Sequence, residues 1–78
     1  MTELYKEIAL TKDIPQQRLR KGDIGTVVEK LTNGQQTGYA VEFFTAVGET
    51  VAVVIVDEGD IEPLKQDEIL HVRKLEAA

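Results

Sequence analysis

Short β-branched stretches separated by glycine-containing turns run through most of this sequence. The three clearest, "IGTVVEKL", "YAVEFFT" and "VAVVIV", are rich in valine, isoleucine, threonine and aromatic residues, which favour β-strands. The segments "TNGQQTG" and "AVGET" lie between them, and their glycine and asparagine residues supply the backbone conformations that tight turns need. Strands of about five to eight residues joined in this way predict a small, strongly bent antiparallel sheet.

We expect four strands, at residues 4–11, 24–31, 39–45 and 51–56. Residues 12–21, which include Pro15, show no apolar period and are expected to form an irregular crossing. The last stretch, residues 68–75, fits either a strand or a short helix, and residues 61–64 could form a single helical turn. The chain is therefore expected to be one all-β domain over residues 1–78, an SH3-like antiparallel barrel of about five strands.

Six residues are assigned to the turns and bends of such a barrel: Gly22, Asp23, Gly25, Asn33, Gly34 and Gly48. Asp23 can accept a hydrogen bond from a nearby backbone N–H, as aspartates in turns do. Asn33 and Gly34 form the pair best suited to a tight turn, because both residues tolerate positive φ. Gly25 lies at the start of a strand, where the lack of a side chain allows a bulge or a sharp bend.

The charge balance is acidic, with a formal net charge of −5. This balance disfavours nucleic acid and anionic membranes as partners, because phosphate contacts need clustered lysine and arginine. A small basic group, Arg18, Arg20 and Lys21, is a candidate anion contact, although charge runs usually form solvated loops. Barrels that bind nucleic acid usually add exposed aromatic side chains, whereas at least two of the tyrosine and phenylalanine residues here are expected in the core.

Patterns typical of catalysis and metal binding are missing. With no cysteine, no serine and a single histidine, the chain cannot assemble a Ser-His-Asp or Cys-His arrangement, so we expect no enzyme activity, no cofactor and no small-molecule substrate. His71 is interpreted as a surface or rim histidine. The acidic segment at residues 57–62 lacks the spacing of a calcium loop and is interpreted as solvated. The N-terminus lacks signal-peptide features and the longest apolar run is too short to span a bilayer, so a cytoplasmic protein is expected.

Five segments in this order carry a resemblance: "LRKGDIGTVVE", "YAVEFF", "GETVAVVIV", "IEPL" and "EILHVRKL". Together they resemble a family of small bacterial proteins classed only as a domain of unknown function, over nearly the whole chain from Tyr5 to Leu75. The resemblance implies a compact barrel with no assigned reaction. It also implies, as one alternative, an antitoxin or immunity-type protein that binds a basic partner. The first segment is similar to the KOW element of nucleic-acid-binding barrels, which makes such a barrel another alternative.

The run "VAVVIV" is the strongest indication of a partner. Six consecutive apolar residues give the strand two apolar faces. An antiparallel strand with one solvent-exposed face should instead alternate between apolar and polar residues. The second cover could be the crossing at residues 12–21, the C-terminal segment or another chain. A strand of this composition risks edge pairing unless something covers it.

The two faces of this run are assigned by alternation. One set is expected to fill the barrel: Val51, Val53 and Ile55. The other set points outward and, with a residue of the neighbouring strand, forms the candidate partner surface: Phe44, Ala52, Val54 and Val56. The sequence therefore favours a non-catalytic protein–protein interaction module, with a symmetric homodimer as the simplest arrangement.

Overall fold

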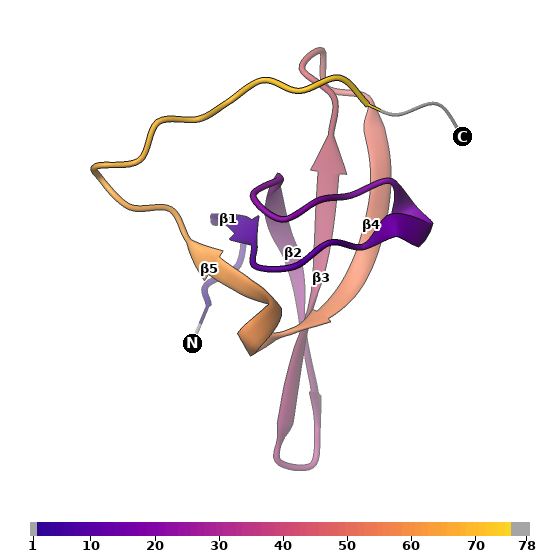
Figure 1. The fold of residues 1–78 in the computed structure, drawn as a ribbon. Helices are drawn as coiled ribbons and strands as arrows, with labels where there is room; N and C mark the ends of the chain where they lie inside the picture. Colours follow the sequence, from indigo (N-terminus) through magenta and orange to yellow (C-terminus); the bar gives the residue numbers. More distant parts are fainter. Residues whose placement is uncertain (1, 76–78) are drawn as a thin grey trace.

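The structure, a computed structural model, describes residues 2–75, and this part of the chain contains five strands and two 3-10 helices (Figure 1). The strands are β1 (Glu7–Leu10), β2 (Ile24–Asn33), β3 (Gln36–Phe44), β4 (Thr50–Asp57) and β5 (Ile61–Pro63). The 3-10 helices are η1 (Pro15–Gln17) and η2 (Glu58–Asp60). The strands form one antiparallel sheet in the order β4-β3-β2-β1-β5. The sheet is strongly bent (Figure 1), and the prediction of an all-β, barrel-like fold with five antiparallel strands is confirmed.

The hairpin of β2 and β3 forms the centre of the sheet. Its ladder runs as far as the pair Asn33 and Gln36, with a bulge at Val28. The turn itself therefore consists of Gly34 and Gln35, one residue later than the Asn33–Gly34 turn predicted from the sequence. Gly34 has a φ of 66°, which suits the first central residue of a two-residue hairpin turn. Because Gly34 by itself supplies the positive φ of the turn, Asn33 can remain in the strand.

Gly25 lies inside β2, where it pairs with Phe43. A Cβ atom at this position would lie 2.6 Å from Cγ1 of Val41 and 2.8 Å from Cε2 of Phe43. Close packing against β3 therefore explains this glycine, and the bulge of β2 lies further along, at Val28 and not at Gly25. By contrast, Gly22 and Gly48 do lie in turns, with φ angles of 92° and 87°.

The core is made of aliphatic and aromatic side chains from all five strands and from the loop before β2. Its buried residues are Ile8, Leu10, Leu19, Val27, Tyr39, Val41, Phe43, Val54, Val56 and Ile61. Tyr39, Val41 and Phe43 follow one another on the inner face of β3 and are at most 2% exposed. They are the residues against which the neighbouring strands pack.

From Ala52 to Val56, β4 turns the opposite face to the core from the one predicted, whereas Val51 packs partly buried against the core as predicted. The structure buries Val54 and Val56, and it leaves Val53 and Ile55 54% and 64% exposed. The predicted outward orientation of Val54 and Val56 is therefore wrong. Phe44, the member of the predicted surface on β3, is 43% exposed.

Strand pairing decides which face of β4 is buried. Residues directly opposite each other on antiparallel strands share a face of the sheet. The three core residues of β3 have these partners on β4: Tyr39 with Val56, Val41 with Val54, and Phe43 with Ala52. Ala52 therefore also points inward and packs partly buried against the core. A run of six apolar residues contains no polar residue that could set this phase, so the sequence alone left the choice open.

The C-terminal part of the chain also differs from the prediction. Residues 61–64 do not form a helical turn; Ile61–Pro63 is β5, and the 3-10 turn η2 comes just before it. Residues 68–75 form neither the strand nor the helix expected, and the chain from 64 to 75 crosses one end of the sheet without regular structure (Figure 1). The physical reason lies in burial: Ile69, Leu70 and Val72 are 88%, 58% and 95% exposed, so the segment buries too little apolar surface to stabilise a helix or a strand.

Candidate interaction surfaces

Residues 20–23 form a tight turn that leads into β2. The backbone N–H of Asp23 donates to the carbonyl of Arg20 at 3.0 Å. The backbone N–H of Arg20 in turn donates to Oδ2 of Asp23 at 2.8 Å, and Gly22 supplies the positive φ. The Gly-Asp pair is thus a structural turn, and it fixes the position of the Asp23 carboxylate.

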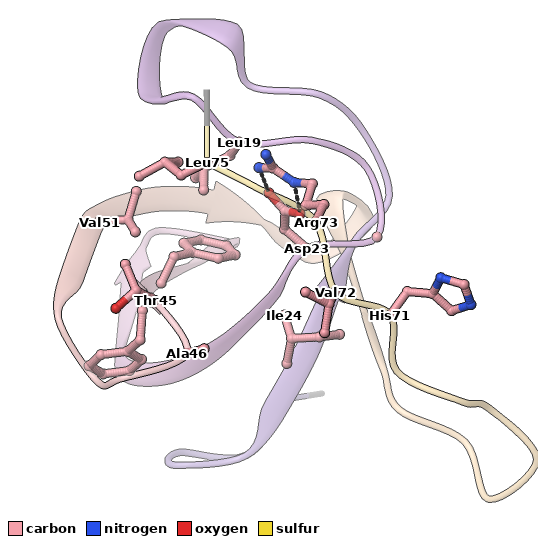
Figure 2. A pocket seen from close by; sticks show the side chains of 13 residues that line it. Leu19, Asp23, Ile24, Thr45, Ala46, Val51, His71, Val72, Arg73 and Leu75 are labelled. Atoms are coloured by element: carbon pink, nitrogen blue, oxygen red, sulfur yellow. Dashed lines mark hydrogen bonds and ion pairs between the residues drawn. The ribbon is translucent and has the colours of Figure 1, made fainter. Parts of the chain in front are cut away.

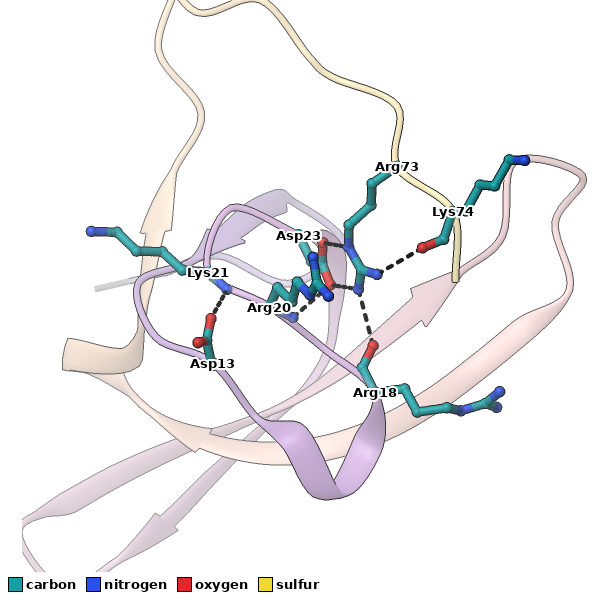
Figure 3. A network of polar contacts seen from close by, with 7 residues as sticks. All are labelled: Asp13, Arg18, Arg20, Lys21, Asp23, Arg73 and Lys74. Carbon is teal, nitrogen blue, oxygen red and sulfur yellow. Dashed lines mark hydrogen bonds and ion pairs between the residues drawn. The ribbon is translucent and has the colours of Figure 1, made fainter. Parts of the chain in front are cut away.

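The Asp23 carboxylate also binds Arg73 near the C-terminus (Figure 3). Nε of Arg73 donates to Oδ1 at 2.8 Å, and Nη2 donates to Oδ2 at 2.5 Å. The same Nη2 donates to the carbonyl oxygen of Arg18 at 2.9 Å. Burial acts to raise the pKa of Asp23, but the hydrogen bonds from Arg73 and from the Arg20 N–H outweigh it and hold this pKa below its usual 3.8. The hydrogen bond to Asp23 likewise raises the pKa of Arg73.

An apolar groove of about 410 Å³ lies beside this ion pair (Figure 2). Its walls come from the loop before β2, the end of β3, the β3–β4 turn and the start of β4. The apolar residues of these walls include Leu19, Ile24, Phe43, Phe44 and Val51. Leu75 contributes to the lining from the C-terminal segment and is 39% exposed. The imidazole ring of His71 points away from the groove (Figure 2) and is exposed.

The segment that borders this groove, residues 64–75, is called the C-terminal strap below. No backbone hydrogen bond joins the strap to the rest of the described chain, and its own backbone bond runs from Glu68 to Lys65 at 3.1 Å. Ile69, Leu70 and Val72 are 88%, 58% and 95% exposed. The side chain of Arg73 is therefore the main polar attachment of the strap.

The outer edge of β4 is a second candidate surface. β4 is a terminal strand of the sheet, so within the described residues no strand pairs with its outer side. A groove of about 580 Å³ lies between this edge and η1, lined by residues 53–56 on one side and residues 12–17 on the other. Val53 and Ile55 stand on the exposed face of the strand beside this groove. This combination leaves both backbone hydrogen-bonding groups and aliphatic side chains available.

The basic group does not form a single patch of charge. The side chains of Arg18 and Lys21 point in opposite directions from the turn (Figure 3). Backbone groups of the same residues hold the loop together, since the N–H of Lys21 donates to Oδ1 of Asp13 at 2.8 Å and the Arg18 carbonyl accepts from Arg73. An anion contact at Arg18, Arg20 and Lys21 stays a prediction.

The acidic stretch after β4 makes local hydrogen bonds. The N–H of Asp57 donates to Oδ2 of Asp60 at 3.0 Å, within a capping box that starts η2. The Glu58 carboxylate accepts from the hydroxyl of Tyr39 at 2.7 Å and from Oγ1 of Thr2 at 2.8 Å. The bond from Tyr39 is the main cause that holds the pKa of Glu58 below its usual 4.5. In the described part of the chain, no three His, Asp or Glu side chains gather as a metal site would require.

The fold defines a small all-β domain of five antiparallel strands. Residues 4–63 match a family described as a domain of unknown function (DUF4926), and the chain belongs to this family. The match ends at β5, so the strap, including "HVR", lies beyond the matched residues although the resemblance was expected to reach Leu75. No curated protein and no solved structure matches the chain. No helix described here has the length and apolar character needed to cross a membrane.

Sequence reasoning missed two features of these surfaces. The pairing of Asp23 with Arg73 joins residues 50 positions apart, and no local pattern signals it. The exposure of Val53 and Ile55 depends on the register of β4 against β3, which alternation alone did not reveal. A pairing of Val54 with Val41, had it been known, would have identified the outward residues.

Proposed function

We propose that this chain is a non-catalytic protein–protein interaction module whose contact surface is the outer edge and exposed face of β4. The observation that carries the proposal is the exposure of Val53 and Ile55, at 54% and 64%, on a terminal strand of the sheet. Exposed edge strands are usually shortened, bulged or protected by charge and proline. The segment from 51 to 56 has neither charge nor proline, and the register shift in β4 lies at Val51, before the stretch that contains Val53 and Ile55. Such an edge is suited to a partner that covers it.

The mode of contact that fits this edge is the addition of a strand. An extended segment laid between β4 and η1 could pair with the free backbone groups of β4, and alternate side chains would contact Val53 and Ile55. Main-chain hydrogen bonds would supply affinity, and the aliphatic side chains would select an apolar strand.

The charges around β4 favour a partner other than a second copy of the chain. Acidic residues flank the strand on both sides, with Glu49 before it and Asp57 and Glu58 at its end. An antiparallel pairing of two copies centred between Val53 and Val54 would place Glu49 of each copy opposite Glu58 of the other. Like charges directly opposite each other destabilise a strand pair. The partner segment is therefore expected to be aliphatic with lysine or arginine at its ends.

Comparative capture from the native host tests this proposal. Tagged wild-type protein, Ile55→Lys and the control Gln35→Lys are used as baits, since Gln35 is exposed at the β2–β3 turn, away from β4. A basic partner at β4 would be supported by a protein that binds both wild type and Gln35→Lys but does not bind folded Ile55→Lys. Its binding to wild type should also weaken as the salt concentration is raised. Equal capture by all three baits would reject the surface. If wild type is a dimer in sedimentation and Ile55→Lys is a monomer, the partner at β4 is a second copy of the chain and not a different protein.

A further inference from the structure

We propose that the groove beside Asp23 is a binding site for an extended peptide segment that carries an arginine next to aliphatic residues, and that the C-terminal strap occupies it as an exchangeable internal ligand. This site is separate from the β4 edge around Val53 and Ile55. The two proposals can therefore fail independently.

The first step of the argument is the geometry around the guanidinium group. Three acceptors converge on Arg73: both carboxylate oxygens of Asp23 and the carbonyl oxygen of Arg18. A planar guanidinium can satisfy two such oxygens at once, whereas the ammonium of lysine acts as a point charge. The arrangement therefore selects arginine.

The acceptors are positioned by the body of the protein and not by the strap. Oδ2 of Asp23 accepts from the backbone N–H of Arg20, and Gly22 holds the turn between them. Arg18 has a left-handed backbone conformation, with φ 61°, at the end of η1. These groups belong to the loop that leads into β2, so they remain in place for an arginine from another source.

The second step is the apolar groove next to these acceptors. Phe43 and Phe44 belong to its lining. Ile24 and Val51 line it too, and Leu75 is the strap residue that lies there beyond Arg73 (Figure 2). An arginine followed by an aliphatic residue two positions later therefore matches the site. The acidic net charge of −5 adds a general attraction for basic segments.

The third step is the weak attachment of the present occupant. The strap has no backbone hydrogen bonds to the sheet among the described residues. Three of its four large aliphatic side chains from Ile69 to Leu75 are more than half exposed. Local opening is easiest where few apolar contacts and no ladder bonds are lost. A competing segment with the same arginine can therefore replace the strap without disturbing the core.

A fluorescence anisotropy experiment with a labelled peptide tests this inference. The probe is the octapeptide "EILHVRKL", the sequence of residues 68–75, and a second peptide has alanine in place of its arginine. The proteins are full-length wild type, Arg73→Ala, Arg73→Lys and the double variant Asp23→Asn with Arg73→Ala. Circular dichroism establishes that each is folded.

The arginine peptide is expected to bind Arg73→Ala at least about tenfold more tightly than wild type, because the internal ligand reduces the fraction of vacant sites. Arg73→Lys should bind the arginine peptide with intermediate affinity. If Arg73→Ala does not fold, the comparison of Arg73→Lys with wild type tests the proposal. The double variant should bind the arginine peptide at least about tenfold more weakly than Arg73→Ala does. Arg73→Ala should likewise bind the alanine peptide at least about tenfold more weakly than the arginine peptide. Equal binding by wild type and the Arg73 variants, or equal binding of both peptides, would overturn the proposal.

Discussion

Val54 of β4 lies directly opposite Val41 of β3, and both side chains are buried in the core. Replacing Val54 with lysine would place a charge among apolar side chains with no partner for it. Burial of an unpaired charge is one of the few changes that cost about 4 kcal/mol or more. We therefore expect Val54→Lys to be unfolded, or nearly so, by circular dichroism at 25 °C.

The matched control for this variant is the adjacent residue Ile55. Its side chain is 64% exposed, so Ile55→Lys should change the free energy of unfolding by about 0.5 kcal/mol or less. Urea titration of both variants measures the contrast. A folded Val54→Lys together with an unfolded Ile55→Lys would mean that the strand has the opposite phase to the one observed.

The contrast between these two residues also shows what the sequence could predict. The β-branched composition and the glycine-containing turns were enough to predict an all-β chain of five strands, because strand propensity and turn chemistry are local properties. The orientation of the Val54 side chain could not be predicted from local properties, because it is set by the pairing of β4 with β3. The position of the last strand was missed for the same reason: Ile61–Pro63 is short and became β5 through its pairing with β1.

The candidate site was predictable only in part. The sequence singled out Asp23 as a turn residue and "VAVVIV" as an unusual strand, and both lie at surfaces described above. Their chemical roles depend on distant partners. Asp23 binds Arg73, which is 50 positions away. The strap that supplies Arg73 forms neither a strand nor a helix. Local patterns cannot identify such a contact.

Gly25 offers a test of packing between β2 and β3. A methyl group at this position would lie 2.6 Å from Cγ1 of Val41, and Val41 is itself fully buried, so neither side can move away at low cost. We expect Gly25→Ala to lower the free energy of unfolding by about 1–3 kcal/mol. The control is Gly59→Ala, because a Cβ there meets nothing within 4 Å. Similar urea midpoints for the two variants would contradict the close approach.

Divalent metal is expected to leave stability unchanged. Asp57 and Asp60 hold each other in the capping box of η2, and Glu58 accepts hydrogen bonds from Tyr39 and Thr2, so calcium would have to replace existing bonds. The melting temperature should be the same within about a degree in excess EDTA and in millimolar calcium. A calcium-dependent rise of several degrees would identify the segment from 57 to 62 as a metal site.

The hydrogen bond between Tyr39 and Glu58 should make stability depend on pH. The pKa of Glu58 is lowered in the folded protein from its usual 4.5, so the charged carboxylate stabilises the fold above that pH. This contribution is lost as the pH falls below about 4.5 and through the lower folded pKa. Glu58→Gln keeps an acceptor oxygen but does not titrate, and it should be less stable than wild type at pH 7 by at most about 1 kcal/mol, since the group is exposed.

The measurement is the difference in free energy of unfolding between wild type and Glu58→Gln at pH 7, 5, 4 and 3. Asp23 also has a lowered pKa, but it is present in both proteins, so its effect cancels in the difference. The difference should be nearly constant from pH 7 to pH 5 and shrink as the pH falls below about 4.5 and through the lower folded pKa. In the background of Tyr39→Phe, which removes the hydroxyl donor and keeps the buried ring, the same difference should be smaller at every pH. A difference that does not change with pH, or that is unaffected by Tyr39→Phe, would show that the Tyr39–Glu58 bond does not stabilise the charged carboxylate.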